Sequence, residues 1–296
     1  MSASSLIRDV LAISRAYSIG YISLAGLAAA LMSPASLSRG AALLLVAIPV
    51  LLTIGASALN DVQHARADAR AGRKRSYPLS LLLAIGLGGV GGAVLLGLWG
   101  GLGVLAGIGG TVFCGLLYGA LKSQPGLGNI ARGLTTVPLI LGLGSLNQAN
   151  WAALPLAVAV GVLDAAGNIY GDERDVFYDR QAGVRTLVVV APRLATAAAL
   201  GLHALAVLLL SWRLFATWPI WLSLAGVIYV RTRPPYWRHR AFLMVKYVTV
   251  GGVALVASVS MLEHAMTVML LVQVVVAWWL YTHIHRTHEV HNASAS

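Results

Sequence analysis

Ten long apolar segments follow one another along the chain, separated by short polar stretches. They are expected at 16–33, 41–59, 79–99, 101–121, 127–147, 151–171, 192–212, 216–230, 242–262 and 265–283. A helix needs about 20 apolar residues to cross the hydrocarbon core of a bilayer. Because backbone polar groups in lipid must be satisfied within the spanning segment, helices are the expected form. The pattern predicts an all-α, polytopic membrane bundle of nine to ten transmembrane helices.

The composition supports a membrane protein and argues against a soluble one. Of the 296 residues, 58% are hydrophobic and 10% are charged, whereas soluble proteins carry about 25% charged residues. We interpret 1–296 as a single integral membrane domain. Its core is expected at about 10–262, followed by an extra C-terminal span at about 265–283 and a polar tail.

The charge distribution predicts the orientation in the membrane. The net charge is +11, and most of the Arg and Lys residues fall in the loops on one side of the predicted bundle. Arg39 and Arg213 fall on the other side. Cytoplasmic loops carry the excess of basic residues, so we expect both termini and the charged face to be cytoplasmic. The basic residues lie at the ends of spans, and a nucleic-acid partner is therefore not expected.

The few acidic residues gather in two segments of this cytoplasmic side. The chain has only ten acids, and four of them lie between positions 172 and 179. At helical spacing, Asp164, Asn168 and Asp172 share a face, and Asp175 and Asp179 continue nearly the same stripe. The first segment repeats this pattern. It contains Asn60, Asp61, His64 and Asp68.

Aligned carboxylates of this kind predict a cation site. Mg²⁺ prefers oxygen ligands and commonly joins carboxylates to substrate phosphates, and the neighbouring arginines suit the remaining phosphate charge. A solvated loop would not need acids that reach back to Asp164 inside an apolar span, since ionisable groups at membrane depth are costly. We therefore expect the two segments to hold Mg²⁺, and the Mg²⁺ to hold a diphosphate.

These motifs resemble those of the UbiA-type intramembrane prenyltransferases. The family's first motif, approximately N-D-x-x-D-x-x-x-D, is matched by Asn60-Asp61-x-x-His64-x-x-x-Asp68. The second, D-x-x-D-x-x-x-D followed by R-x-x-G-x-x-T-L, is matched by 172–187. A Tyr…Lys…Gly-Asn element between them is matched by Tyr118, Lys122, Gly128 and Asn129. The three elements occur in the family's order, which makes the match specific.

The resemblance implies a helical bundle around a central cavity that is open laterally to lipid, with both aspartate motifs over it. It implies a polyprenyl diphosphate donor, a small lipophilic or aromatic acceptor such as a quinone precursor, and Mg²⁺ as cofactor. The implied metal ligands are Asn60, Asp61, Asp68, Asp172, Asp175 and Asp179. The implied diphosphate-binding residues are Asn60, His64, Arg66, Arg75, Tyr118, Lys122, Asn129, Asn168, Arg180 and Arg185.

Three features depart from the family pattern. His64 replaces a usual aspartate, and imidazole suits softer metals than Mg²⁺. The span after residue 262 is additional to the usual nine. Arg75-Ser76-Tyr77-Pro78-Leu79 stands where Arg-Pro-Leu is more common. The first departure leaves open a terpene cyclase of the same fold, in which the cation is captured by the donor's own double bonds. A cation-coupled transporter is a further alternative, although its acids would be spread through the spans.

Two charged residues within the predicted spans have open roles. Asp164, about two turns deeper than Asp172, either orients the acceptor, acts as a base, or hydrogen-bonds a Ser or Asn on another helix. Arg132 either reaches the cavity or extends its guanidinium to the interface. The glycines of 86–110 are expected to allow close helix packing. Those of 86–91 fit G-x-G-x-x-G, but without a preceding strand they do not indicate a dinucleotide site.

Overall fold

The described part of the chain is built from helices only. The computed structural model describes residues 16–70, 77–214 and 218–284. Its α-helices are α2 (Ala16–Ala30), α3 (Arg39–Arg70), α4 (Leu79–Gly100), α5 (Leu102–Leu121), α6 (Leu127–Leu134), α7 (Val137–Ser145), α8 (Leu154–Ala182), α9 (Leu187–Val190), α10 (Pro192–Leu214), α11 (Trp218–Arg231), α12 (Pro235–Ala257) and α13 (Met261–Ile284), and a short 3₁₀ helix, η1 (Asn150–Ala153), precedes α8. The predicted all-α class is confirmed.

Six helical segments in the described residues are long and apolar enough to cross a membrane. They are Arg39–Gln63, Leu79–Gly100, Leu102–Leu121, Trp151–Ala182, Pro192–Trp212 and Trp237–Ala257. Ser18–Ala30, Pro219–Arg231 and Met261–Val276 are apolar but shorter. Together with the apolar side chains exposed on α4 and α5, such as Leu95 and Phe113, they mark an integral membrane protein. The count of nine to ten spans stays a prediction.

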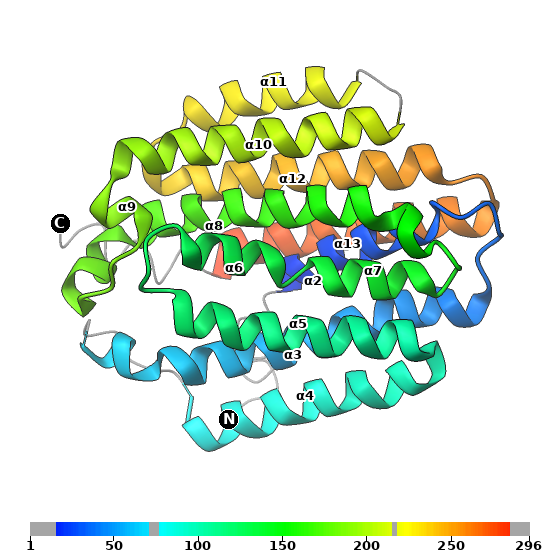
Figure 1. Ribbon diagram of the computed structural model, residues 1–296, viewed down its shortest axis with the longest axis horizontal. Helices are drawn as coiled ribbons and strands as arrows, with labels where there is room; N and C mark the ends of the chain where they lie inside the picture. Colours follow the sequence, from blue (N-terminus) through cyan, green and yellow to red (C-terminus); the bar gives the residue numbers. More distant parts are fainter. Residues whose placement is uncertain (1–15, 71–76, 215–217, 285–296) are drawn as a thin grey trace.

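The long helices lie side by side, and their connections alternate between the two ends of the bundle (Figure 1). The connections α5–α6, α8–α9 and α11–α12 lie at the left end of this view, and α2–α3, α4–α5 and α12–α13 at the right. Helix α8 is central, because it packs against α6, α10 and α12 and also contacts α2, α3 and α7. A residue on α8 can therefore face several other helices.

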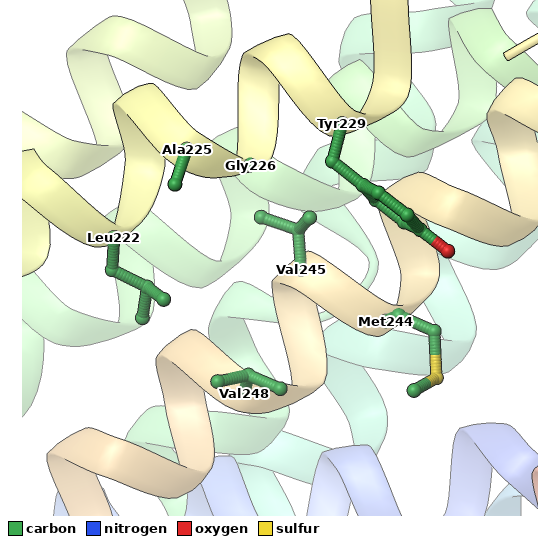
Figure 2. A pocket seen from close by; sticks show the side chains of 7 residues that line it. All are labelled: Leu222, Ala225, Gly226, Tyr229, Met244, Val245 and Val248. Carbon is green, nitrogen blue, oxygen red and sulfur yellow. The ribbon is translucent and has the colours of Figure 1, made fainter. Parts of the chain in front are cut away.

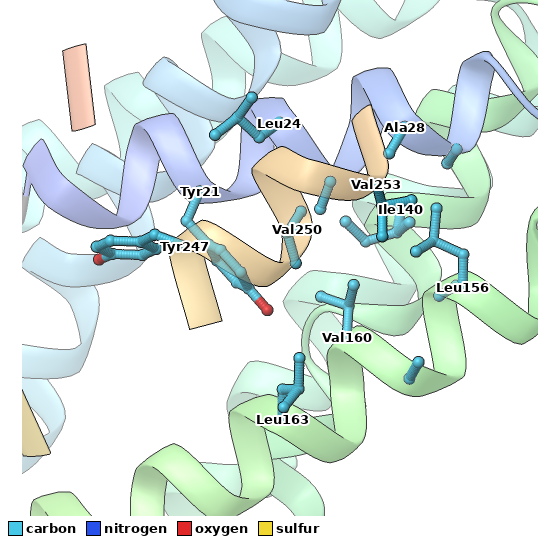
Figure 3. Packing of buried hydrophobic residues seen from close by; sticks show 14 of the residues in the cluster. Tyr21, Leu24, Ala28, Ile140, Leu156, Val160, Leu163, Tyr247, Val250 and Val253 are labelled. Atoms are coloured by element: carbon cyan, nitrogen blue, oxygen red, sulfur yellow. The ribbon is translucent and has the colours of Figure 1, made fainter. Parts of the chain in front are cut away.

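The core lies where α2, α7, α8 and α12 meet. Figure 3 shows it as a cluster of buried side chains from these four helices, including Tyr21, Leu24, Ala28, Ile140, Leu156, Val160, Leu163, Tyr247, Val250 and Val253. Small residues are frequent among them, so the backbones approach closely, as membrane helices do when packing rather than water exclusion holds them together.

Some predicted spans differ from the observed helices. The span expected at 127–147 is two helices, α6 and α7, because the chain turns at Thr135 and Thr136. Pro138 in the first turn of α7 explains the break, since proline lacks the N–H that a continuous helix would use and obstructs the preceding turn. The span expected at 242–262 begins earlier, at Pro235, and ends at Ala257.

Helices α3 and α8 are longer than a bilayer requires. With 32 and 29 residues, they extend about 48 Å and about 43 Å at 1.5 Å per residue, against a hydrocarbon core of about 30 Å. Their final turns therefore project beyond the core. Those turns carry the two aspartate motifs, and both lie at the left end of Figure 1.

Candidate active site

One face of α8 carries a row of polar side chains, each of which contacts a different helix. Asp164 accepts a hydrogen bond of 2.6 Å from Lys246 on α12. One turn later, Asn168 accepts a hydrogen bond of 3.4 Å from the hydroxyl of Tyr118 on α5. The shared face predicted from the spacing of these residues is thus a column of polar contacts that runs from the core to the end of the bundle.

Asp172 continues this column and is buried. Its Oδ2 accepts a hydrogen bond of 2.9 Å from Nδ2 of Asn129 on α6. Lys122 attracts the Asp172 carboxylate, whereas Asp179 and Asp175 repel it. Asp179 is also buried. Burying an ionised carboxylate costs several kcal/mol, so like charges gathered here indicate a site that a cation completes.

Asp175 is placed differently from Asp172 and Asp179. It is partly exposed and forms a two-point ion pair with Arg174, with Nε donating at 3.1 Å and Nη2 at 2.8 Å. Nη1 of Arg174 lies 3.4 Å from Nδ1 of His239 on α12. The neighbouring Glu173 forms an ion pair with Arg238, which also lies on α12, at an N···O distance of 3.4 Å. The start of α12 therefore fixes the last turns of α8.

The Tyr…Lys…Gly-Asn element forms one local unit. Tyr118 lies in the last turn of α5 and Lys122 caps that helix. A Cβ added at Gly128 would lie 3.0 Å from the Lys122 Cα and 3.1 Å from the Leu121 carbonyl oxygen. Only glycine fits this approach without displacing the backbone. This close approach places Asn129 beside the end of α5. From there the Asn129 side chain reaches Asp172.

The sequence after Asp179 ends α8. Gly183 adopts φ +71, a left-handed conformation that costs glycine little, and its N–H donates to the Arg180 carbonyl at 3.2 Å. Arg180 and Arg185 flank this turn and are exposed. Both are therefore accessible to a ligand in front of the α8 end.

The first aspartate motif lies on α3. Asn60 and Asp61 are partly buried, and α3 contacts α8 directly. His64, Arg66 and Asp68 lie on the same helix, at positions whose side chains are outside the described residues, and Arg75 lies outside the described residues altogether. The structure thus brings the helices of the two motifs together, and the ligand set itself stays a prediction.

Three residues of the site were not predicted from the sequence. Lys246 falls near the start of the span expected at 242–262, but it lies in the middle of α12 and is buried. Its ammonium lies 3.8 Å from the centroid of the Tyr21 ring and 6.0 Å from that of the Tyr247 ring. A lysine within an apolar helix was the available signal, because such a charge needs a partner. Asp164, on which three roles were left open, is that partner.

A metal at this site would need the substrate to supply some of its ligands. Among the described residues, no three His, Cys, Asp or Glu side chains form a ready-made cage. The available donors are nevertheless oxygens, and Mg²⁺ is usually held by one or two carboxylates plus substrate phosphates rather than by an all-protein cage. The chemistry of Asp172, Asp179 and Asp61 fits that mode of binding.

A separate hollow lies on the outside of the bundle, between α11 and α12. Its volume is about 250 Å³. Figure 2 shows the lining residues, Leu222, Ala225, Gly226, Tyr229, Met244, Val245 and Val248. Its lining is almost wholly apolar, and none of the aspartates contributes to it. We attach no catalytic role to it. The lipid-open central cavity implied by the resemblance stays a prediction.

The fold and the site together define an integral membrane protein with an acid-rich polar site at one end of a helical bundle. The sequence profile of the UbiA prenyltransferase family matches residues 20–240. The chain belongs to the UbiA prenyltransferase family and is a membrane enzyme of the prenyltransferase class. The comparison with curated proteins gives no match.

Solved structures of UbiA homologues have the same fold. An apo UbiA homologue from Aeropyrum pernix K1 is 18% identical, with a TM-score of 0.64 over 80% of this chain and 97% of that chain. A UbiA homologue from Archaeoglobus fulgidus, bound to GPP and Mg²⁺, is 15% identical, with a TM-score of 0.64 over 83% and 99%. A digeranylgeranylglyceryl phosphate synthase is 18% identical, with a TM-score of 0.58 over 92% and 98%.

Proposed function

We propose that the protein transfers a polyprenyl group from a polyprenyl diphosphate to a small acceptor within the membrane, in a Mg²⁺-dependent reaction. The observation that carries this proposal is the gathering of buried carboxylates on α8 beside Lys122 and Asn129, at the end of the bundle where α3 carries the first motif. Relatives of the same fold are bound to GPP or DMAPP together with Mg²⁺, which supports a prenyl diphosphate as the donor.

The acids of the two motifs would hold Mg²⁺, which supplies charge neutralisation of the diphosphate. Asp61, Asp68, Asp172, Asp175 and Asp179 are the proposed carboxylate ligands, with Asn60 beside them. Asn129 orients Asp172, and Arg174 must release Asp175 before that carboxylate can serve as a ligand. Because His64 is a poor Mg²⁺ ligand, we assign it to the diphosphate instead.

The basic residues at the same end would stabilise the leaving group. Lys122, Arg180 and Arg185 place positive charge where the diphosphate gains negative charge as the allylic C–O bond breaks. The electron pair leaves with the diphosphate, and a nucleophilic carbon or oxygen of the acceptor captures the allylic cation. The apolar core below the site would hold the prenyl chain and exclude water from that cation.

Asp164 would act on the acceptor side of the reaction. Lys246 already occupies Oδ1 of Asp164 at 2.6 Å. The pair therefore favours the orienting role over the role of base. An aromatic acceptor would then release its proton to the departed diphosphate.

We place this site on the cytoplasmic face. The proposal rests on the positive-inside rule, because the basic loops and both aspartate motifs belong to the same end of the bundle. An intracellular diphosphate donor would reach the site directly from that side.

The test measures diphosphate release by the full-length protein in detergent, with GPP and Mg²⁺, with and without an aromatic acceptor. Transfer predicts release that depends on the acceptor. Release without acceptor would favour the terpene cyclase, and no release would favour a non-enzymatic role such as transport. Product mass spectrometry would identify the prenylated compound.

Variants of the proposed carboxylate ligands test the site residues directly. Asp175→Ala and Asp68→Ala are each expected to reduce turnover by about 10²–10³-fold, the usual effect of losing one preorganised electrostatic contact. Glu173→Gln is a matched control, because Glu173 is another acid of α8 but forms an ion pair with Arg238 of α12 and is not a proposed metal ligand. Near-normal activity of both aspartate variants at limiting Mg²⁺ would refute the assignment of these aspartates as Mg²⁺ ligands.

A further inference from the structure

The apolar hollow between α11 and α12 runs along part of the depth of one leaflet. Its α11 wall consists of Leu222, Ala225, Gly226 and Tyr229, which share one face of that helix at helical spacing. From Leu222 to Tyr229 the hollow extends about 10 Å, at 1.5 Å per residue. One leaflet provides about half of a hydrocarbon core that is about 30 Å thick. The hollow is therefore short enough to lie within a single leaflet.

The hollow opens to the outside of the bundle. Gly226 and Val245 are buried at its base, whereas Ala225 and Val248 are exposed along its rim. Figure 2 shows Tyr229 at one end, with its hydroxyl directed away from the rest of the lining. In a bilayer an apolar opening of this kind faces lipid chains.

A cation marks the end of the hollow at Tyr229. The guanidinium carbon of Arg233 lies 4.6 Å from the centroid of the Tyr229 ring, which is within the range of a cation–π contact. A guanidinium is planar and carries its N–H donors around its edge, so this contact leaves donors available to an anion. Arg238 holds the arrangement in place, because its Nε donates to the Arg233 carbonyl oxygen at 3.2 Å. The hollow is therefore apolar along its length and positively charged at one end.

The hairpin that carries Arg233 lies at the level expected for lipid headgroups. Trp237, near the start of α12, is 42% exposed, and exposed tryptophans favour the membrane–water interface. Arg231 and Arg233 are exposed on the same hairpin. In the part of the chain that the structure describes, neither forms an ion pair with an acid. An anionic headgroup would supply that missing partner.

The side of the membrane also favours an anionic lipid. The α11–α12 connection lies at the same end of the bundle as the α8–α9 connection (Figure 1), and we place that end in the cytoplasm. The cytoplasmic leaflet carries anionic lipids, and basic pockets between transmembrane helices on that side bind their headgroups.

Other occupants fit the hollow less well. A 10 Å length of helix about 10 Å wide occupies about 800 Å³, whereas the hollow has a volume of about 250 Å³. A helix of a second copy could lie across the hollow but could not fill it, and a flexible hydrocarbon chain can. The hollow is also not part of the proposed active site, because no aspartate of either motif lines it.

We propose that the hollow between α11 and α12 binds one anionic phospholipid of the cytoplasmic leaflet, with an acyl chain along the apolar lining and the phosphate against Arg233. The lipid is a resident ligand and not a substrate, so the proposal does not depend on the proposed function. It supports α11, which packs chiefly against α10 and α12. A ligand that binds only the folded state stabilises that state.

The experiment measures lipid binding to the full-length protein in detergent by native mass spectrometry, together with the thermal midpoint. The probes are dioleoyl phosphatidylglycerol, dioleoyl phosphatidylcholine and inorganic phosphate. The two lipids have the same chains, so a difference between them reports the headgroup. We expect one phosphatidylglycerol to bind saturably, at least tenfold more tightly than phosphatidylcholine, and to raise the thermal midpoint. Inorganic phosphate alone should do neither.

Variants separate the headgroup contact from the chain contact. Arg233→Gln should weaken phosphatidylglycerol binding at least fivefold and leave phosphatidylcholine binding unchanged. Its control is Arg193→Gln, since Arg193 is an exposed arginine of α10 that adjoins no part of the hollow. Ala225→Trp should fill the hollow and weaken binding of both lipids. Its control is Leu224→Trp, because Leu224 is 53% exposed on the same helix but does not line the hollow.

Three results would overturn the proposal. The first is equal binding of the two lipids to the wild-type protein, which needs no variant to fold. The second is phosphatidylglycerol binding that neither Arg233→Gln nor Ala225→Trp weakens. The third is a lipid-free dimer that Ala225→Trp dissociates, which would assign the hollow to a second copy. Displacement of the lipid by GPP with Mg²⁺ would likewise count against a site separate from the reaction.

Discussion

Asp172 depends on Asn129 more than on any residue close to it in sequence. The carboxylate is buried, and the amide that donates to it at 2.9 Å comes from a position 43 residues earlier. Its other near neighbours on α8, Asp175 and Asp179, are acids that repel it. A hydrogen bond to a charged group contributes about 1.5–3 kcal/mol, and this one orients the Asp172 carboxylate toward Asn129.

Replacing Asn129 should therefore weaken cation binding. In Asn129→Ala the Asp172 carboxylate loses its amide donor, and we expect the Mg²⁺ concentration for half-maximal activity to rise about tenfold, since about 1.4 kcal/mol corresponds to a factor of ten. Asn129→Asp adds a like charge and should raise it further. A Mg²⁺ titration with a lower plateau and an unchanged midpoint would instead mean that Asn129 contacts the substrate.

Helices α3 and α4 owe their close packing to glycines in register. A Cβ added at Gly89 would lie 2.6 Å from the Leu51 carbonyl oxygen and 2.8 Å from the Gly55 Cα. These are backbone atoms, which cannot move aside as a flexible side chain can. The small-residue packing expected for 86–110 is thus confirmed at this contact. It also bears on the site, because α3 carries Asp61.

A pair of glycine variants in α4 tests this contact. Gly89→Ala should force the helices apart, at a cost of about 1–3 kcal/mol for overpacking, and lower the thermal midpoint measured in detergent. Gly88→Ala is the matched control, since a Cβ there meets nothing within 4 Å. It should be neutral or stabilising, because alanine favours a helix over glycine by about 1 kcal/mol. Equal midpoints for the two variants would contradict this account.

At the scale of the whole molecule, the sequence predicts those features that depend on hydrophobic periodicity and composition. The helical class and the polar face of α8 follow from patterns local in the chain. The sequence does not predict the break between α6 and α7, although it contains Pro138. A continuous apolar run does not show where the surrounding helices leave room for a turn. The Lys246–Asp164 pair joins residues 82 positions apart, and only the packing of α8 against α12 determines it.

The orientation of the whole bundle is also a prediction from sequence. Ten spans with basic loops on one side predict that both chain ends lie in the cytoplasm. In a Cys114→Ala background, Ser4→Cys and Ser294→Cys should both resist an impermeant thiol reagent added outside intact cells. Both should react once the membrane is opened. Labelling of one from outside and the other only after opening would require an odd number of spans, and the helix to reconsider first is α13, which lies beyond the family match at 20–240.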